Sequence, residues 1–215
     1  QRQMCIRDRY HTFSFANYYN PRRIHFGALR VLNDDRISPG EGFDMHPHKN
    51  MEVVSIPLKG YLKHGDSIEN QSIITPGEIQ VMSTGKGIYH SEYNGSNEKD
   101  LELLQIWIIP NKEETEPEYH NYNILPLMKH NELATFISPN GNTPAHLLQD
   151  AWFSMGTLSA NHKVSYHLHK PHTGVYFFII EGNVDIADEN LTRRDGIGIW
   201  AVSYTHLTLP TTSRV

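Results

Sequence analysis

The chain has 215 residues, enough for one large domain or two small ones, since a single hydrophobic core rarely grows beyond ~250 residues. Hydrophobic residues make up 38% of the sequence, which with the 15 glycines is ordinary for a folded domain and excludes intrinsic disorder. Lys and Arg number 19 against 24 Asp and Glu, so the formal net charge is −5, and we expect no direct binding of nucleic acid and no membrane-surface role.

The two ends of the sequence resemble translated sequencing adapter rather than natural protein, in residues 1–9 and 202–215. We expect both segments to be non-native, in which case Cys5 and His206 carry no chemistry. The alternative is a frayed N-terminus and a final β-strand, because residues 202–209 alternate in a strand-like way.

No signal-peptide pattern opens the chain, and no apolar run approaches the ~18–20 residues that cross a bilayer. The single cysteine, Cys5, cannot form an internal disulfide, which suits a reducing compartment. We therefore expect a cytoplasmic protein whose metal ligands, where it has any, are nitrogen and oxygen atoms.

Short runs of β-branched and aromatic residues, bounded by Gly, Pro, Asn and Asp, dominate the rest of the chain and predict an all-β fold. The clearest predicted strands are residues 27–32, 51–58, 78–82, 101–109, 152–158, 164–169, 175–181 and 184–187. Residues 101–109 are apolar on both faces except for Glu102 and Gln105, so we expect a central strand covered on each side. Only residues 126–136 offer a modest helical pattern.

Residues 111–123 are charged, polar and proline-containing, which predicts a linker between two halves. The second half contains a Gly182-Asn183 pair that is typical of a hairpin turn between antiparallel strands. We therefore predict two consecutive antiparallel β-barrels of jelly-roll type, at residues 10–110 and 124–201.

Two histidine-containing pairs in the first half have the spacing of a metal site. His46 and His48 are two positions apart, and on an extended strand both imidazoles then point to the same face. Pro47 between them lacks a ladder donor, which suits a sheet edge or a bulge. His90 and Glu92 repeat this spacing about forty residues later. If both strands line one barrel interior, the four groups converge on one ion.

Three neutral imidazoles and one carboxylate suit one divalent transition metal, with Fe(II), Cu, Ni, Mn, Co and Zn all acceptable. Four protein ligands leave two positions open in an octahedral field, which indicates a reactive rather than a structural site. The alternative is that each pair lies on the surface or in the core of a purely structural barrel and binds no metal.

The sequence also resembles the pirin family, a branch of the cupin superfamily. The motifs that carry the resemblance are HTFSFANYY (residues 11–19), FGALRVLNDD (26–35), PGEGFDMHPHKNMEVVS (39–55) and STGKGIYHSEYN (83–94). The resemblance continues to about residue 200. It implies a bicupin whose first barrel holds iron, Fe(II) above the other ions, through His46, His48, His90 and Glu92, and whose second barrel is metal-free. Relatives continue beyond residue 200, so the second barrel is expected to be incomplete, with an unpaired edge.

Some bacterial relatives act as quercetin 2,3-dioxygenases, so the resemblance implies an oxidoreductase acting on a flavonol or a related enol with O2. Glu92 is then a ligand and also a catalytic acceptor of the substrate proton. Other relatives are described as iron-dependent cofactors of transcription regulators, so the alternative is a non-catalytic metal-dependent protein with a protein partner. We expect a monomer in either case.

Several further residues have expected roles near the site or away from it. Glu52 occupies a cupin ligand position that pirins do not use, so it either orients a ligand imidazole or lies on the surface. Tyr93 and Asn94 are expected in turn and packing roles. Candidates for the wall of a substrate pocket are Phe13, Phe15, Phe43 and Met45. The second histidine cluster, His167, His169 and His172, is a conceivable second metal site, but solvent-facing strand histidines are the expectation.

Overall fold

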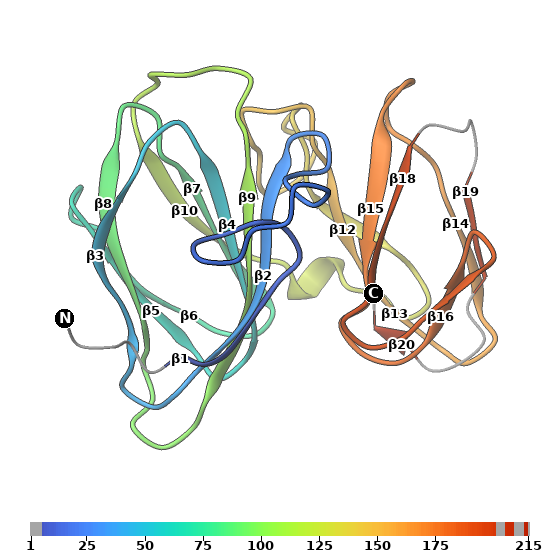
Figure 1. Cartoon of the computed structure of the whole chain (residues 1–215), viewed down its shortest axis with the longest axis horizontal. Coiled ribbons are helices and arrows are strands. Elements are labelled where there is room, and N and C mark those ends of the chain that lie inside the picture. Colours follow the sequence, from blue (N-terminus) through green and yellow to red (C-terminus); the bar gives the residue numbers. More distant parts are fainter. Residues whose placement is uncertain (1–5, 201–204, 209–212, 215) are drawn as a thin grey trace. The chain divides into compact units, whose positions relative to one another are not determined.

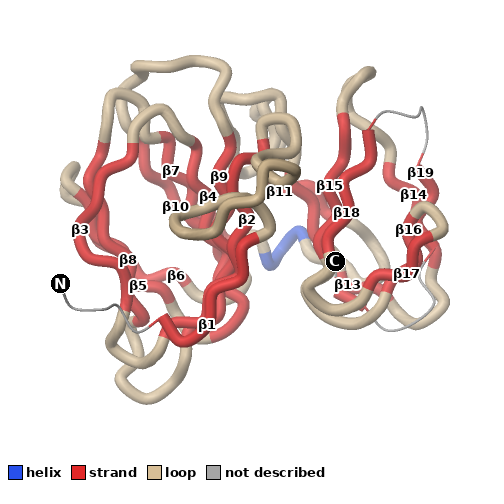
Figure 2. The backbone as a smooth tube through the Cα atoms, in the orientation of Figure 1, coloured by secondary structure: helices blue, strands red, loops and turns tan. Residues whose placement is uncertain are grey.

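The computed structural model describes residues 6–200, 205–208 and 213–214, with side chains described for residues 8–200. The chain forms two compact units, one made of Gln1–Leu125 with Pro144–Ala151 and the other of Pro126–Thr143 with Trp152–Val215. Strands dominate both units, and the described residues contain one short 3-10 helix, η1 (Leu125–Leu127) (Figure 2). Every pairing between named strands is antiparallel, so the predicted all-β fold is confirmed.

The first unit contains a six-stranded sheet with β9 at its centre. Its order is β1 (Ile6–His11), β2 (Leu29–Ile37), β9 (Leu101–Ile108), β4 (Glu52–Lys59), β7 (Glu78–Ser83) and β10 (Glu118–Asn123). Strand β9 pairs with β2 on one side and β4 on the other, and most of its residues are buried. The prediction of a central covered strand at this position is confirmed.

A four-stranded sheet faces the first one and completes the barrel (Figure 1). Its order is β3 (Gly42–His48), β8 (Ile88–Asn94), β5 (Leu62–Asp66) and β6 (Gln71–Ile74). Burial alternates along β8, where every second residue from Ile88 to Asn94 is buried. This alternation is the period-two pattern of a strand with one face in a core, and it directs one row of β8 side chains into the barrel.

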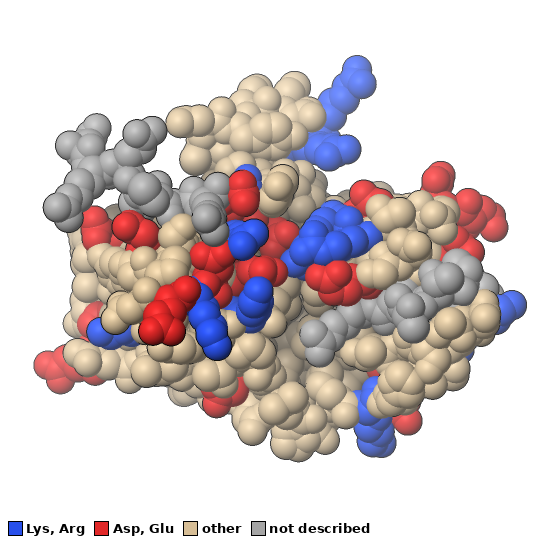
Figure 3. All heavy atoms as spheres, turned by 90° about the horizontal axis from the view of Figure 1, so that it is seen from below, with Lys and Arg blue, Asp and Glu red and all other residues tan. Residues whose placement is uncertain are grey.

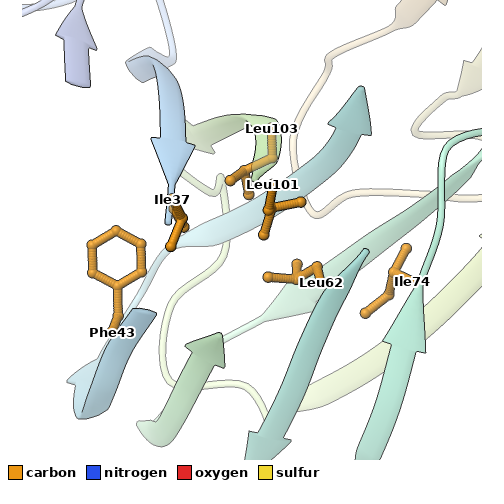
Figure 4. Packing of buried hydrophobic residues seen from close by; sticks show 6 residues of the cluster. All are labelled: Ile37, Phe43, Leu62, Ile74, Leu101 and Leu103. Carbon is orange, nitrogen blue, oxygen red and sulfur yellow. The ribbon is translucent and has the colours of Figure 1, made fainter. Parts of the chain in front are cut away.

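One apolar cluster of the first unit joins the two sheets (Figure 4). It consists of six buried side chains from β2, β3, β5, β6 and β9, namely Ile37, Phe43, Leu62, Ile74, Leu101 and Leu103. Burying one Leu or Ile side chain stabilises a fold by about 1.5–3 kcal/mol. This cluster therefore fixes the two sheets against each other, and a second buried apolar cluster of Val53, Met82 and Ile88 does the same between β4, β7 and β8.

The second unit is built from shorter strands. They are β11 (Ala134–Ile137), β12 (Phe153–Met155), β13 (Thr157–Leu158), β14 (Lys163–Tyr166), β15 (Gly174–Phe178), β16 (Val184–Ile186), β17 (Glu189–Leu191), β18 (Gly196–Trp200), β19 (Thr205–Thr208) and β20 (Ser213–Arg214). Their sheets are β11-β12, β13-β20, β15-β18 and β14-β19-β16-β17. A separate core of Leu158, Phe177, Ile179, Val184 and Ile186 holds this unit together.

Three local predictions differ from the structure. The segment predicted as a linker, residues 111–123, ends in strand β10, which pairs along its full length with β7. The predicted helix at residues 126–136 is wrong: η1 ends at Leu127, and Ala134 already begins β11. The Gly182-Asn183 turn does not close a hairpin either, because β15 pairs with β18 whereas β16 pairs with β17 and β19.

The described surface mixes charges of both signs, as Figure 3 shows for one face, where Lys and Arg side chains lie among Asp and Glu side chains. This distribution matches the small negative net charge of the sequence. Within the described ranges, no helix has the length and apolar character needed to cross a bilayer.

Candidate metal centre

Strand β3 brings the first histidine pair together at the edge of the four-stranded sheet. Its pairing with β8 shifts register between Phe43 and His46, so Pro47 lies on an edge strand beside a bulge, as predicted. The imidazole centroids of His46 and His48 are 4.9 Å apart. The i, i+2 spacing therefore places both rings on one face of the strand.

Strand β8 supplies the second pair from the neighbouring position in the same sheet. His90 and Glu92 are both fully buried, on the inward row of β8, and His90 lies directly opposite His46 in the β3–β8 register. The His90 ring centroid is 4.4 Å from that of His46 and 4.8 Å from that of His48. One ligand atom from each of the three histidines lies within 4.8 Å of the others, which is compatible with a shared ion.

The hydrogen bonding of the three imidazoles fits a metal ligand set. His46 Nδ1 lies 2.7 Å from the backbone oxygen of Asp44, a contact that fixes the ring and leaves Nε2 available. His90 is buried, yet neither of its ring nitrogens has a hydrogen-bond partner. Such an orphaned buried group is costly unless something binds it, and the unprotonated nitrogen can donate its lone pair to a metal ion.

The electrostatic environment keeps the inner imidazoles neutral, which is the form that binds metal. Burial, assisted by the neighbouring His46 and His64, lowers the pKa of His90 to about 3. Burial, assisted by His90 and His46, also lowers the pKa of His48 to about 3. Both rings can therefore present a lone pair across the neutral pH range.

Glu92 reaches across the barrel to a row of three polar side chains on the opposite sheet. Its Oε1 accepts hydrogen bonds from Ser55 Oγ (2.9 Å) and Gln80 Nε2 (3.0 Å), and its Oε2 accepts one from Gln105 Nε2 (2.5 Å). Ser55 lies directly opposite both Gln80 and Gln105 in the registers of β4 with β7 and β9. This donor row holds the carboxylate in the barrel interior.

The structure divides the predicted ligand set. His46, His48 and His90 form one group, whereas Glu92 forms a second group with His90 and with His64 of β5, in each case with ligand atoms within 4.8 Å. The sequence prediction missed His64. A signal for it was present, because His64 and Asp66 repeat the i, i+2 spacing of the other two pairs.

Comparison with known proteins identifies the family. Residues 1–108 match the family model described as Pirin, and residues 135–215 match the model described as Quercetinase C-terminal cupin domain. A quercetin 2,3-dioxygenase of Escherichia coli is 38% identical over 193 residues, covering 90% of this chain and 82% of the relative. The chain belongs to the pirin family.

Two further relatives support this pirin assignment. A pirin-like protein of Caulobacter vibrioides is 36% identical and covers 88% of this chain and 82% of its own length. The crystal structure of the bacterial pirin YhhW from Escherichia coli in complex with nickel(II) superposes with a TM-score of 0.90 at 35% identity, covering 96% of this chain and 88% of that one. The predicted family and bicupin fold are therefore confirmed.

Aromatic rings lie beside the histidine group of this pirin, and two of them belong to the predicted pocket wall: Phe43 contacts His46 edge-on at 6.3 Å, and Phe15 contacts Trp107. Trp107 of β9, which the sequence prediction missed, lies edge-on to His48 at 4.7 Å, and Phe15 packs edge-on against Trp107 at 5.2 Å. Phe43 belongs to the apolar core and Phe13 is buried, whereas Met45 is 55% exposed. Trp107 and Phe43 are therefore the rings in contact with the imidazoles, and Phe15 contacts Trp107.

The remaining candidates have structural contacts. Glu52 is buried and accepts hydrogen bonds from Ser83 Oγ and the backbone N–H of Leu148, so neither proposed role, orienting an imidazole or lying on the surface, matches its contacts. Tyr93 donates a hydrogen bond to Asp44, and the Asn94 amide donates to two backbone oxygens, as expected of packing residues.

The second histidine cluster lies in the second unit. His169 stacks on Trp152, with ring centroids 5.0 Å apart and planes 13° from parallel, and it lies edge-on to Tyr166 at 5.9 Å. Both groups of converging ligand atoms found among the described residues are in the first unit.

Proposed function

We propose that this pirin is a metal-dependent dioxygenase that acts on a flavonol such as quercetin, or on a related enol, with O2 as second substrate. His46, His48, His90 and Glu92 hold one divalent ion, Fe(II) above Ni, Cu, Mn, Co or Zn. The observation that carries the proposal is the convergence of three imidazoles on the inner face of one sheet. The names of the relatives and the donor set add support.

The residues of this chain fit such an ion. Buried His90 has no hydrogen-bond partner, so its lone-pair nitrogen is available to a metal ion, and the lowered pKa values of His48 and His90 remove proton competition. Assigning Glu92 as the fourth ligand rests on the family resemblance, since its carboxylate groups with His64 and His90 in this structure. The bound ion would supply Lewis acidity that favours the deprotonated form of an enol hydroxyl.

The protein side chains then have distinct tasks. Trp107 lies beside His48 and Phe15 packs against Trp107, so these two rings offer an aromatic surface on which a flat substrate can stack. A carboxylate has about four lone-pair positions, and the three donors on Glu92 leave one, on Oε2. This lone pair would bind the ion, and we assign to Glu92 the acceptance of the substrate hydroxyl proton when its carboxylate dissociates from the ion.

Oxygen consumption tests the proposal directly. The metal-loaded protein is expected to take up O2 when quercetin is added, and the same protein stripped with a chelator is expected to take up none above the background of quercetin autoxidation. The measurement is an oxygen-electrode trace with Fe(II), Ni(II) and Co(II) loaded in turn. His120→Gln is a matched control, because His120 is half exposed on β10, an edge strand of the other sheet from the one that carries the three histidines, and this variant should keep full uptake.

An absence of metal-dependent uptake with every loaded ion, from protein shown to hold one ion per chain, would contradict the dioxygenase proposal for this substrate. A protein partner captured only by the metal-loaded form, together with no turnover, would instead favour the regulatory alternative.

The donor row on Glu92 gives a second prediction. Replacing Gln105 by leucine removes the hydrogen bond to Oε2 and leaves the carboxylate free to turn away from its position, so metal affinity should fall by about 10–100-fold. Equilibrium dialysis against Co(II) measures the change. Gln71→Leu, at an exposed position on β6, is the matched control and should bind as the wild type does. Unchanged affinity in the Gln105 variant would show that Glu92 does not depend on this row.

A further inference from the structure

His64 lies beside the proposed ligands but on a different strand. In the β5–β8 register it faces Glu92, and Asp66 faces His90. His64 is 1% exposed, and both His90 and Glu92 are 0% exposed. One ligand atom from each of His64, His90 and Glu92 lies within 4.8 Å of the other two.

The contacts of His64 leave one of its ring nitrogens available to bind a metal ion. Its Nε2 lies 3.1 Å from Oδ2 of Asp66, and because a carboxylate only accepts hydrogen bonds, this contact assigns the proton to Nε2. The lone pair is then on Nδ1, which is buried and has no partner. The ring is also held flat against Tyr119, at 4.1 Å and 16°. A carboxylate on the far nitrogen of an imidazole is the usual support of a metal-binding histidine.

The two other members of the group can serve a second position as well as the first. Neither nitrogen of His90 has a hydrogen-bond partner, and the neutral ring carries its lone pair on one nitrogen or the other according to the tautomer, so His90 can serve either group. Glu92 keeps one free lone pair on Oε2 beside its three hydrogen bonds.

We propose that His64, His90 and Glu92 form a second position for a divalent transition-metal ion, distinct from the position between His46, His48 and His90. Two imidazoles and one carboxylate suit the same borderline ions as the first position. Because both positions use His90, and two divalent ions so close together repel each other strongly, they are alternatives for one ion. This inference goes beyond the dioxygenase proposal and needs no turnover.

The test removes the first position and asks whether metal still binds. The double variant His46→Ala, His48→Ala is stripped with a chelator and titrated with Co(II), following both equilibrium dialysis and the visible spectrum of the bound ion. We expect it to bind one Co(II) per chain more weakly than the wild type. Adding His64→Gln should then weaken binding by at least a further 100-fold and abolish the Co(II) spectrum, a loss of about 2.7 kcal/mol. Gln keeps a donor for Asp66.

Two further variants test whether the remaining Co(II) binding depends on the surroundings of His64. In the double-variant background, Asp66→Asn should lower Co(II) affinity by about 10–100-fold because the supporting carboxylate is lost, whereas His120→Gln should change nothing. Thermal melts of the metal-free proteins establish that each is folded. A folded double variant that binds no Co(II), or that binds it equally with and without His64, would overturn the second position. Neither result bears on oxygen uptake by the wild type, which tests the first position separately.

Discussion

Replacing His90 by leucine is expected to abolish metal binding and, at the same time, to stabilise the metal-free protein. His90 belongs to both groups of converging ligand atoms, so its loss leaves each group with two of its three members. The wild-type imidazole is buried with neither nitrogen paired, which costs about 1–3 kcal/mol for a polar group without partners. Leucine has a similar volume and no polar atom, so it removes this cost without opening a large cavity.

Two measurements check this prediction on the same protein. Co(II) titration should find at least about 100-fold weaker binding, and urea unfolding of the chelated proteins should find the variant more stable by about 1–3 kcal/mol. Tyr89→Leu is the matched control on the same strand, because Tyr89 is 55% exposed on the outer row of β8. If the His90→Leu variant still binds metal as the wild type does, His90 is not a metal ligand. If the metal-free variant is less stable than the metal-free wild type, the unpaired imidazole of His90 does not lower the stability of the fold.

The sequence was most informative where one local pattern determines the geometry. The i, i+2 spacing of His46 with His48, and of His90 with Glu92, is enough to place each pair on one face of a strand. The apolar run at residues 101–109 likewise predicts the central strand β9, since a strand covered on both faces has no polar row.

Predictions failed where tertiary pairing overrides local composition. Glu118–Asn123 is polar enough to suggest a linker, yet it forms β10 because β7 offers a free sheet edge for its backbone. The Gly182-Asn183 pair is typical of a hairpin turn, but the flanking strands do not pair with each other: β15 pairs with β18, and β16 pairs with β19. Local turn residues specify a change of direction and not the identity of the neighbouring strand.

The set of metal ligands also depends on strand pairing that the local sequence does not predict. The row of Ser55, Gln80 and Gln105 that holds Glu92 comes from three strands whose register is not readable from one sequence. His64 had the spacing of a ligand pair with Asp66, but its approach to His90 depends on β5 pairing with β8. Which carboxylate and which imidazoles share an ion is therefore decided by strand order.

Acid should destabilise the metal-free protein more than it destabilises the His90→Leu variant. Burial lowers the folded-state pKa of His90 to about 3, against an ordinary value of 6.5. The unfolded chain therefore binds more protons between these two pH values, so the contribution of His90 to stability is complete above pH 6.5 and is lost as the pH falls toward 3. His48, lowered to about 3 by burial first and by its histidine neighbours second, acts in the same direction in both proteins.

The comparison between the two proteins isolates His90 from opposing carboxyl groups. Burial raises the pKa values of Asp35 and Glu52, which makes the folded state bind protons more readily and adds stability as the pH falls, but both proteins share this effect. The difference in unfolding free energy should therefore widen by about 3 kcal/mol between pH 7 and pH 4, as expected for one imidazole shifted by this amount. Urea unfolding of the chelated proteins at several pH values measures the gap. If the difference in unfolding free energy between the two proteins stays constant with pH, His90 has an ordinary pKa. The assignment of His90 as a neutral imidazole without a partner, on which the metal centre depends, would then be wrong.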